Sequence, residues 1–231
     1  VNSTPIVIRS LTGVFPHNFR DLTLVSGTIG DYAALVVHKD SPINSMTDLV
    51  AAYNSDMSGT AIGGGSVPGG MDHLVAAMVM QAAGADPTAV KYIPYDTGGP
   101  AMAALLSGEI KALSTGFSEA VDMAKAGEVK IIGVTSDARV DAFGDAPTMK
   151  EQGIDANFVN WRGFFGAPGL PADKLAAYQD AIAKMYETPE WEAVRARNGW
   201  VNIHNPGADF QSFLENQEQV IGDLMKKLGF L

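Results

Sequence analysis

The sequence predicts an α/β fold with a mainly parallel sheet. Three strand–turn–helix junctions follow one another between residues 60 and 126, and each turn contains glycine. Two continuous apolar, β-branched runs, residues 32–37 and 131–135, are typical of strands that are buried on both faces, as in parallel sheets. With 231 residues, 46% of them hydrophobic, the chain is long enough to bury one large core or two modest ones.

Composition excludes several classes of function. The formal net charge is −10 and the chain has no Lys/Arg cluster, so we expect no binding to nucleic acid or to an anionic membrane. The absence of cysteine excludes disulfides and thiolate catalysis, and four scattered histidines lack metal-ligand spacing, so we predict no metal and no cofactor. No apolar run approaches the roughly 20 residues of a membrane span, and the N-terminus lacks a signal-peptide pattern.

The first elements are predicted from apolar runs and capping residues. Residues 1–8 contain the apolar run Ile6-Val7-Ile8 with no turn signal before it, so we expect the chain to begin part-way through an element. Residues 15–22 predict a turn or short helical segment. Ser45 is the expected N-cap of the next helix, and Asp48 stands where a capping-box residue reaches back.

Three junctions of the same design fill the centre of the chain. Glycines end the predicted helices, with Gly84 closing the first and Gly127 the third. Because parallel strands place their carboxyl ends at one edge of a sheet, all three turns should lie along that edge. The first two predicted strands are residues 60–62 and 90–93, and residues 113–118 lead into the third helix. The helices are predicted at residues 72–83, 101–107 and 119–126.

The final third of the chain is expected to be helical. A short helix ends at Gly153, and residues 158–169 form an extended apolar stretch that is a plausible return crossing between domains. Prolines near the starts of the later segments favour helix initiation. The amphipathic helices are predicted at residues 171–186, 189–198 and 207–228.

The glycine-dense loop at residues 63–73 is the best candidate for a ligand cradle. Bare backbone N–H groups at the start of a helix bind phosphate or carboxylate. The loop fits neither nucleotide motif, because Pro68 stands at the third glycine of the dinucleotide pattern and no Gly-Lys-Ser/Thr follows. Two alternatives remain: a flexible turn without a ligand, and a nucleophile elbow at Ser66 that lacks its last glycine and requires His204 as the catalytic histidine.

Six motifs together resemble the substrate-binding proteins of tripartite tricarboxylate transporters, also called Bug-type receptors. The resemblance covers nearly the whole chain in the family's order. The motifs are Gly63-Gly64-Gly65-Ser66 through Asp72-His73-Leu74, Tyr92-Ile93-Pro94-Tyr95-Asp96-Thr97-Gly98-Gly99-Pro100-Ala101, Leu105-Leu106-Ser107-Gly108-Glu109, Ile132-Gly133-Val134-Thr135-Ser136, Ala146-Pro147-Thr148 and Trp161-Arg162-Gly163-Phe164-Phe165-Gly166-Ala167-Pro168-Gly169.

The resemblance implies a periplasmic binding protein type II fold, in which two α/β lobes close on a small organic acid. Residues 40–153 would form the second lobe, and residues 1–39 with 154–231 the first. The implied function is a periplasmic, monomeric receptor that passes a di- or tricarboxylate, or an aromatic acid, to a membrane permease. Family members begin with a strand and a Pro/Gly-rich loop carrying an Asp, which has no match here, so we expect the first lobe to be truncated at its N-terminus.

The same resemblance places ligand contacts on the three turns and on the return crossing. For Ser66 and Thr97, bonding to their own turn is nearly as plausible, and for Arg162 an ion pair between lobes is an equal alternative to a bidentate ligand contact. His73 is as plausible in a structural role. The expected ligand-binding residues are Gly65, Ser66 and Gly69, then Thr97, Gly98 and Gly99, then Thr115, Gly116 and Phe117, and finally Arg162.

Overall fold

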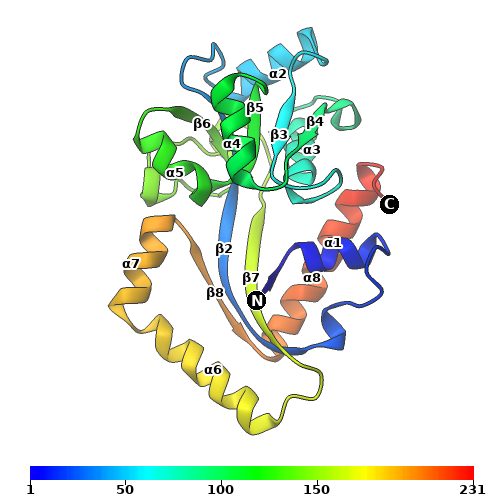
Figure 1. Ribbon diagram of the computed structural model, residues 1–231, viewed down its shortest axis with the longest axis vertical. Coiled ribbons are helices and arrows are strands. Elements are labelled where there is room, and N and C mark those ends of the chain that lie inside the picture. The colour runs from blue at the N-terminus through cyan, green and yellow to red at the C-terminus, as the bar shows by residue number, and fades with distance from the viewer. The chain divides into compact units, whose positions relative to one another are not determined.

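The computed structural model describes residues 1–231 and divides them into two compact units (Figure 1). Unit 1 comprises Val1–Asp31 and Asn160–Leu231, and unit 2 comprises Tyr32–Val159. The chain therefore leaves unit 1 within β2 (Thr23–His38) and returns at the start of β7 (Val159–Gly166). The lobe boundaries expected from the sequence, 39/40 and 153/154, both lie inside unit 2. None of the helices combines the length and apolar character that a membrane span requires.

Unit 2 is built on a mixed sheet. The strands of the three predicted junctions, β3 (Ile62–Gly64), β4 (Tyr92–Pro94) and β5 (Ala112–Gly116), pair in parallel as expected. The run at residues 32–37 is a strand, but it pairs antiparallel with β5 and with β6 (Val129–Val134). Burial on both faces, and not strand direction, produces a continuous apolar run, so the parallel assignment of that strand was wrong.

Alternate residues of β2 enter the two apolar layers of unit 2. Leu35 and Val37 pack with residues of α2 (Met46–Ser55) and α3 (Met71–Ala82). Val36 packs with residues of α4 (Gly98–Ser107) and α5 (Phe117–Lys125). Since neighbouring side chains of a strand point to opposite faces, helices cover both sides of the sheet. The connecting turns include η2 (Pro87–Ala89), η3 (Asp141–Phe143) and η4 (Lys150–Gln152).

The predicted helix boundaries hold where a cap defines them. Ser45 is the N-cap of α2, and its hydroxyl accepts a hydrogen bond from the Asp48 N–H at 3.1 Å. Gly84 adopts the left-handed conformation just after α3, with φ of 82°. The exception is α4, which begins at Gly98 and not at residue 101 as expected. Two glycines therefore form its first turn, a position that propensity alone disfavours.

Unit 1 pairs its strands antiparallel: β1 (Asn2–Ser3) with β7, and β2 with β8 (Val201–Pro206). The strand β8 was missed by the prediction of a wholly helical final third. Half-buried Val201 and Ile203 alternate with exposed Asn202 and His204, but this alternation covers only four residues between two predicted helices. The helical elements are α1 (Pro5–Leu11), η1 (Phe19–Asp21), α6 (Ala172–Tyr186), α7 (Pro189–Asn198) and α8 (Ala208–Lys227).

An aromatic cluster joins β7 to α8 inside unit 1. Trp161 is fully buried and meets the rings of Phe210 and Phe213 edge-on, with centroid distances of 6.0 and 6.1 Å. Gly163 is required beside them, because a Cβ there would stand 2.3 Å from Phe210. The return crossing expected at residues 158–169 is thus fixed by core packing in this unit.

Candidate functional site

A groove of about 510 Å³ opens in unit 2 where β5 ends and α4 and α5 run beside each other. Its polar end is formed by the first turn of α4 and by the start of α5, and its walls are apolar. Of the predicted ligand residues, Gly98, Gly99 and Thr115 line it. The complete lining is Gly98, Gly99, Met102, Ala103, Leu106, Thr115, Glu119 and Met123.

The first turn of α4, which lines this groove, carries unused hydrogen-bond donors. The N-cap residue Thr97 is extended, and its side chain makes no capping bond. The N–H groups of Gly98 and Gly99 have no hydrogen-bond partner within the protein, and Pro100 has no N–H. A Cβ built on Gly99 meets nothing within 4 Å. Two free donors at the positive end of a helix dipole form a site suited to a carboxylate.

The glycine loop at residues 63–73 differs from the cradle that its composition predicts, because its amides are bonded internally. The Gly69 N–H donates to His73 Nδ1 at 3.0 Å, and the Gly70 N–H donates to the Val67 carbonyl at 2.8 Å. The Ser66 N–H faces the Tyr92 hydroxyl at 3.4 Å, and that hydroxyl donates to the Ser66 carbonyl at 2.8 Å. The loop is therefore a rigid support for the site and not a row of bare donors.

Close backbone contacts hold the three turns together. A Cβ on Gly65 would stand 2.5 Å from the Gly98 nitrogen and 2.6 Å from the Thr97 carbonyl carbon, so the first turn touches the second through backbone atoms. A Cβ on Gly98 would stand 2.5 Å from Glu119 Oε2, so the second turn touches the third. Glycine is required at 65 because its contacts are backbone atoms, whereas the contact at 98 is with the end of the Glu119 side chain.

Two carboxyl groups that sequence reasoning missed lie at this edge. Glu119 Oε2 accepts a hydrogen bond from Thr115 Oγ1 at 2.5 Å. Asp72 is only 7% exposed, and its burial, together with the charge of Glu119, raises its pKa to about 7. Hydrogen bonds from the Ser66 side chain and the Gly65 N–H act in the opposite direction and are outweighed. In sequence, an acid in the first turn of a helix is ordinary dipole compensation, so neither residue stood out.

Several predicted site residues have other surroundings. The Phe117 side chain is fully buried in the core layer beneath α4 and α5, and Gly116 pairs with Ala33 in the sheet. Thr97 is exposed but does not line the groove. Arg162 belongs to unit 1, where Nη1 donates to the carbonyl oxygens of Asn160 and Trp161 at 3.2 Å each.

The surroundings of Ser66 do not form the arrangement that a hydrolase needs. Its hydroxyl lies 3.1 Å from the Tyr92 hydroxyl and accepts the Asp72 N–H at 3.0 Å. His204, the histidine that the hydrolase hypothesis requires, is on β8 of unit 1, with its ring 4.7 Å from that of Tyr186. Ser66 therefore serves as a structural hydrogen-bonding group within its loop.

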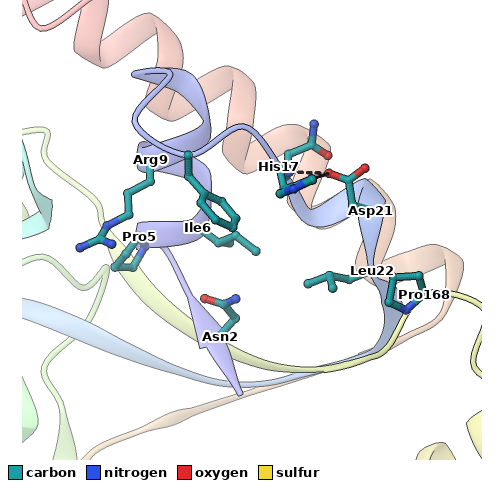
Figure 2. Close-up of a pocket in the computed structure, with 10 residues that line it drawn as sticks. Asn2, Pro5, Ile6, Arg9, His17, Asp21, Leu22 and Pro168 are labelled. Carbon is teal, nitrogen blue, oxygen red and sulfur yellow. Dashed lines mark hydrogen bonds and ion pairs between the residues drawn. The ribbon is translucent and has the colours of Figure 1, made fainter.

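A larger cavity of about 760 Å³ lies in unit 1 and contains none of the expected ligand residues. Figure 2 shows Arg9 and Pro5 on one side of it and Leu22 and Pro168 on the other. Its only ion pair joins His17 to Asp21 at 3.4 Å. Its walls are mainly apolar, and it holds none of the turns at the carboxyl ends of the unit 2 strands, so the smaller groove of unit 2 is the better candidate for carboxylate recognition.

Comparison with known proteins agrees with the fold. A UPF0065 protein of Bordetella pertussis is 26% identical over 235 residues, which cover 97% of this chain and 71% of that protein. The crystal structure of a TctC solute-binding protein from Polaromonas is 25% identical, with a TM-score of 0.77 over 98% of this chain and 77% of that one. MatC from Rhodopseudomonas palustris with bound malate has a TM-score of 0.82 at 17% identity, covering 96% of this chain and 77% of MatC.

The Polaromonas structure is a solute-binding protein, so the expected binding-protein fold of two α/β lobes is confirmed. The model of the family described as "Tripartite tricarboxylate transporter family receptor" matches residues 7–230. Membership of a receptor family excludes the Ser66 hydrolase alternative, and the protein is not an enzyme. Because this match covers nearly the whole chain, the protein belongs to the tripartite tricarboxylate transporter receptor family.

Proposed function

We propose that this protein is a periplasmic receptor that binds a small organic carboxylate and delivers it to the membrane permease of a tripartite tricarboxylate transporter. The ligand is a di- or tricarboxylate or an aromatic acid. The receptor works as a monomer and needs neither a metal nor a cofactor. The bound malate of MatC, a protein of the same fold, is consistent with this ligand class.

One observation carries the proposal: the free N–H groups of Gly98 and Gly99 meet at the polar end of an otherwise apolar groove. With a net charge of −10, the protein cannot attract an acid through its overall field, so local donors must do so. Each hydrogen bond to a charged group contributes about 1.5–3 kcal/mol, and micromolar binding requires about 8 kcal/mol. Two amides therefore account for part of the affinity, and the remaining predicted contacts complete the site.

The predicted contacts divide according to their surroundings. Gly98, Gly99 and Thr115 line the groove and are the residues that we assign to direct contact. Gly65, Ser66 and Gly69 form the supporting loop, and Gly116 and Phe117 anchor the third turn in the sheet and core. We keep Thr97 and Arg162 as ligand contacts of the closed, liganded receptor. The Thr97 hydroxyl and the Arg162 guanidinium can both donate hydrogen bonds to a carboxylate.

The proposal is tested by removing one donor without changing the shape of the site. Proline at position 99 deletes the N–H and is tolerated in the first turn of a helix, whereas alanine retains the N–H, and the space around Gly99 is open. We expect Gly99→Pro to weaken binding about tenfold or more, and Gly99→Ala to bind like the wild type. Calorimetric titration with malate, citrate, adipate and benzoate measures both variants.

Binding of none of these acids to the wild-type protein, or equal affinities for the proline and alanine variants, would contradict the proposal. Thermal unfolding of both variants without ligand provides the control for folding. A carboxylate that raises the melting temperature of the wild type and of Gly99→Ala, but not of Gly99→Pro, identifies this amide as part of the site.

A further inference from the structure

The carboxylate of Glu119 is an unexpected group in a site for acids. It lines the groove, and its Oε2 lies against the Cα of Gly98, where an added Cβ would stand only 2.5 Å away. Its hydrogen-bond donor is the neutral hydroxyl of Thr115, and it takes part in no ion pair. The groove thus presents an acceptor-only group beside two free donors.

This arrangement imposes a condition on any acid that binds the amides of α4. A ligand carboxylate on the N–H groups of Gly98 and Gly99 comes close to the Glu119 carboxylate, and two like charges at such a distance repel each other. This repulsion is offset when the ligand places a hydrogen-bond donor between its own carboxylate and that of Glu119. A hydroxyl or ammonium on the carbon next to the ligand carboxylate stands in that position.

The second oxygen of Glu119 is available for this contact. Oε2 accepts the Thr115 hydroxyl, while Oε1 would lie 3.6 Å from an added Cβ on Gly98 and has no protein donor. The hydrogen bond from Thr115 fixes the orientation of the carboxylate, so Oε1 is held in place without a partner. A fixed, charged acceptor discriminates strongly against ligands that cannot donate to it, because it then loses its hydration without compensation.

We propose that Glu119 is a specificity-determining residue that selects acids bearing a hydroxyl or ammonium group next to the carboxylate over acids without such a donor. This inference rests on the proposed function and narrows its ligand class. In the complex, the amides of Gly98 and Gly99 hold the carboxylate, Glu119 accepts the adjacent donor, and the apolar walls at Met102 and Met123 contact the rest of the ligand.

Matched acids test the inference on the unmodified protein. Succinate, malate and aspartate share one carbon skeleton and differ only in carrying no donor, a hydroxyl or an ammonium. Citrate and propane-1,2,3-tricarboxylate form the corresponding tricarboxylate pair. We expect the donor-bearing member of at least one set to bind about tenfold or more tightly than its plain counterpart. Preference for malate or citrate identifies the hydroxyl, and preference for aspartate alone identifies the ammonium.

The Glu119→Gln variant locates the origin of that preference. Glutamine keeps an acceptor for Thr115 and removes the charge, so the plain acids should gain affinity and the preference should fall below about threefold. Glu128→Gln removes an exposed carboxylate that pairs with Lys39 at the opposite end of the sheet, and it should leave the preference unchanged. Melting curves of both variants check that they fold.

The outcomes separate the two proposals. Equal affinity for plain and donor-bearing acids in the wild type, or a preference that persists in Glu119→Gln, overturns the specificity role while leaving a carboxylate receptor. Failure of all five acids to bind the wild type overturns this inference, and failure of adipate and benzoate to bind as well overturns the proposed function. The ligand series itself uses only the wild type, so the inference stays testable even where a variant is unstable.

Discussion

The helices α2 and α4 begin at opposite ends of the unit 2 sheet and differ in whether the N–H groups of their first turns are hydrogen-bonded. Where β5 and β6 begin, α2 starts with its donors occupied: the Met46 N–H donates to Gln152 Oε1 at 2.9 Å and the Asp48 N–H to Ser45 Oγ. Where β3, β4 and β5 end, α4 starts with the N–H groups of Gly98 and Gly99 unbonded. The first turn of α2 is completed by side chains, and the first turn of α4 is not.

The contrast shows that free donors at α4 follow from the local sequence and not from an inability of this chain to cap helices. A suitable N-cap residue is present at α4, because Thr97 belongs to the preferred class, yet its hydroxyl makes no capping bond. Gly98, which follows it, leaves room for the Glu119 carboxylate, and Gly65 leaves room for the Gly98 backbone. The proposed function assigns these uncapped donors to ligand binding.

The largest effect is expected from the buried carboxyl of Asp72 at the open end. Its pKa in the folded protein, about 7, exceeds the usual 3.8, so the folded state holds the proton more tightly. This contribution to stability is complete below about pH 4 and is lost as pH rises through about 7, a change on the order of 4 kcal/mol. Asp72→Asn should abolish this pH dependence and be more stable than the wild type at about pH 8.

Urea unfolding at about pH 5 and about pH 8 measures this difference. Asp122→Asn provides the matched control, because Asp122 is an exposed acid on α5. If Asp72→Asn keeps the pH dependence of the wild type, the carboxyl is not protonated in the folded protein and the account of its burial is wrong.

The next effect concerns the contact between the first two turns. Gly65→Ala introduces a Cβ 2.5 Å from the Gly98 nitrogen, so one backbone segment must move. We expect a loss of roughly 1–3 kcal/mol in the free energy of unfolding, together with weaker carboxylate binding because the α4 donors are displaced. Gly99→Ala, in open space, should cost nothing measurable. Equal stability of the two variants would show that the turns do not pack as described.

The sequence predicted the fold well because periodicity and caps report local structure directly. The apolar run at residues 32–37, the Ser45 cap and the Gly84 helix end all appear where they were placed. The direction of β2 could not be predicted, because a strand buried on both faces has the same composition whether its neighbours run parallel or antiparallel. The strand β8 was missed because its apolar–polar alternation covers only four residues, Val201 to His204, between two predicted helices.

The candidate site was predicted only in part, for a different physical reason. Glycine content marks turns, and it correctly brought Gly98 and Gly99 into one groove with Thr115. It cannot show whether an amide is free, since that depends on partners distant in sequence, such as the Tyr92 hydroxyl that meets Ser66. The same limit hid Glu119, whose importance arises from its contact with Gly98 and not from its neighbours in the chain.

A smaller effect is expected at the capped end of the sheet. Ser45→Ala removes the hydroxyl that satisfies the Asp48 N–H, and the loss of an N-cap costs about 1 kcal/mol. Because α2 takes no part in the groove, carboxylate affinity should remain at the wild-type value. Chemical unfolding and calorimetric titration of the same preparation measure the two quantities. A weaker affinity in this variant would mean that the two ends of the sheet are energetically coupled.

The smallest effect on stability is expected from the corresponding residue at the open end. Thr97→Ala deletes an exposed hydroxyl that caps nothing, so the free energy of unfolding should change by less than about 0.5 kcal/mol. If Thr97 contacts the ligand as proposed, affinity falls by the value of one hydrogen bond, about tenfold. Ser45→Ala and Thr97→Ala should then give opposite patterns, one changing stability alone and the other binding alone. A stability loss at Thr97 equal to that at Ser45 would show that α4 is capped in solution and that its amides are not reserved for a ligand.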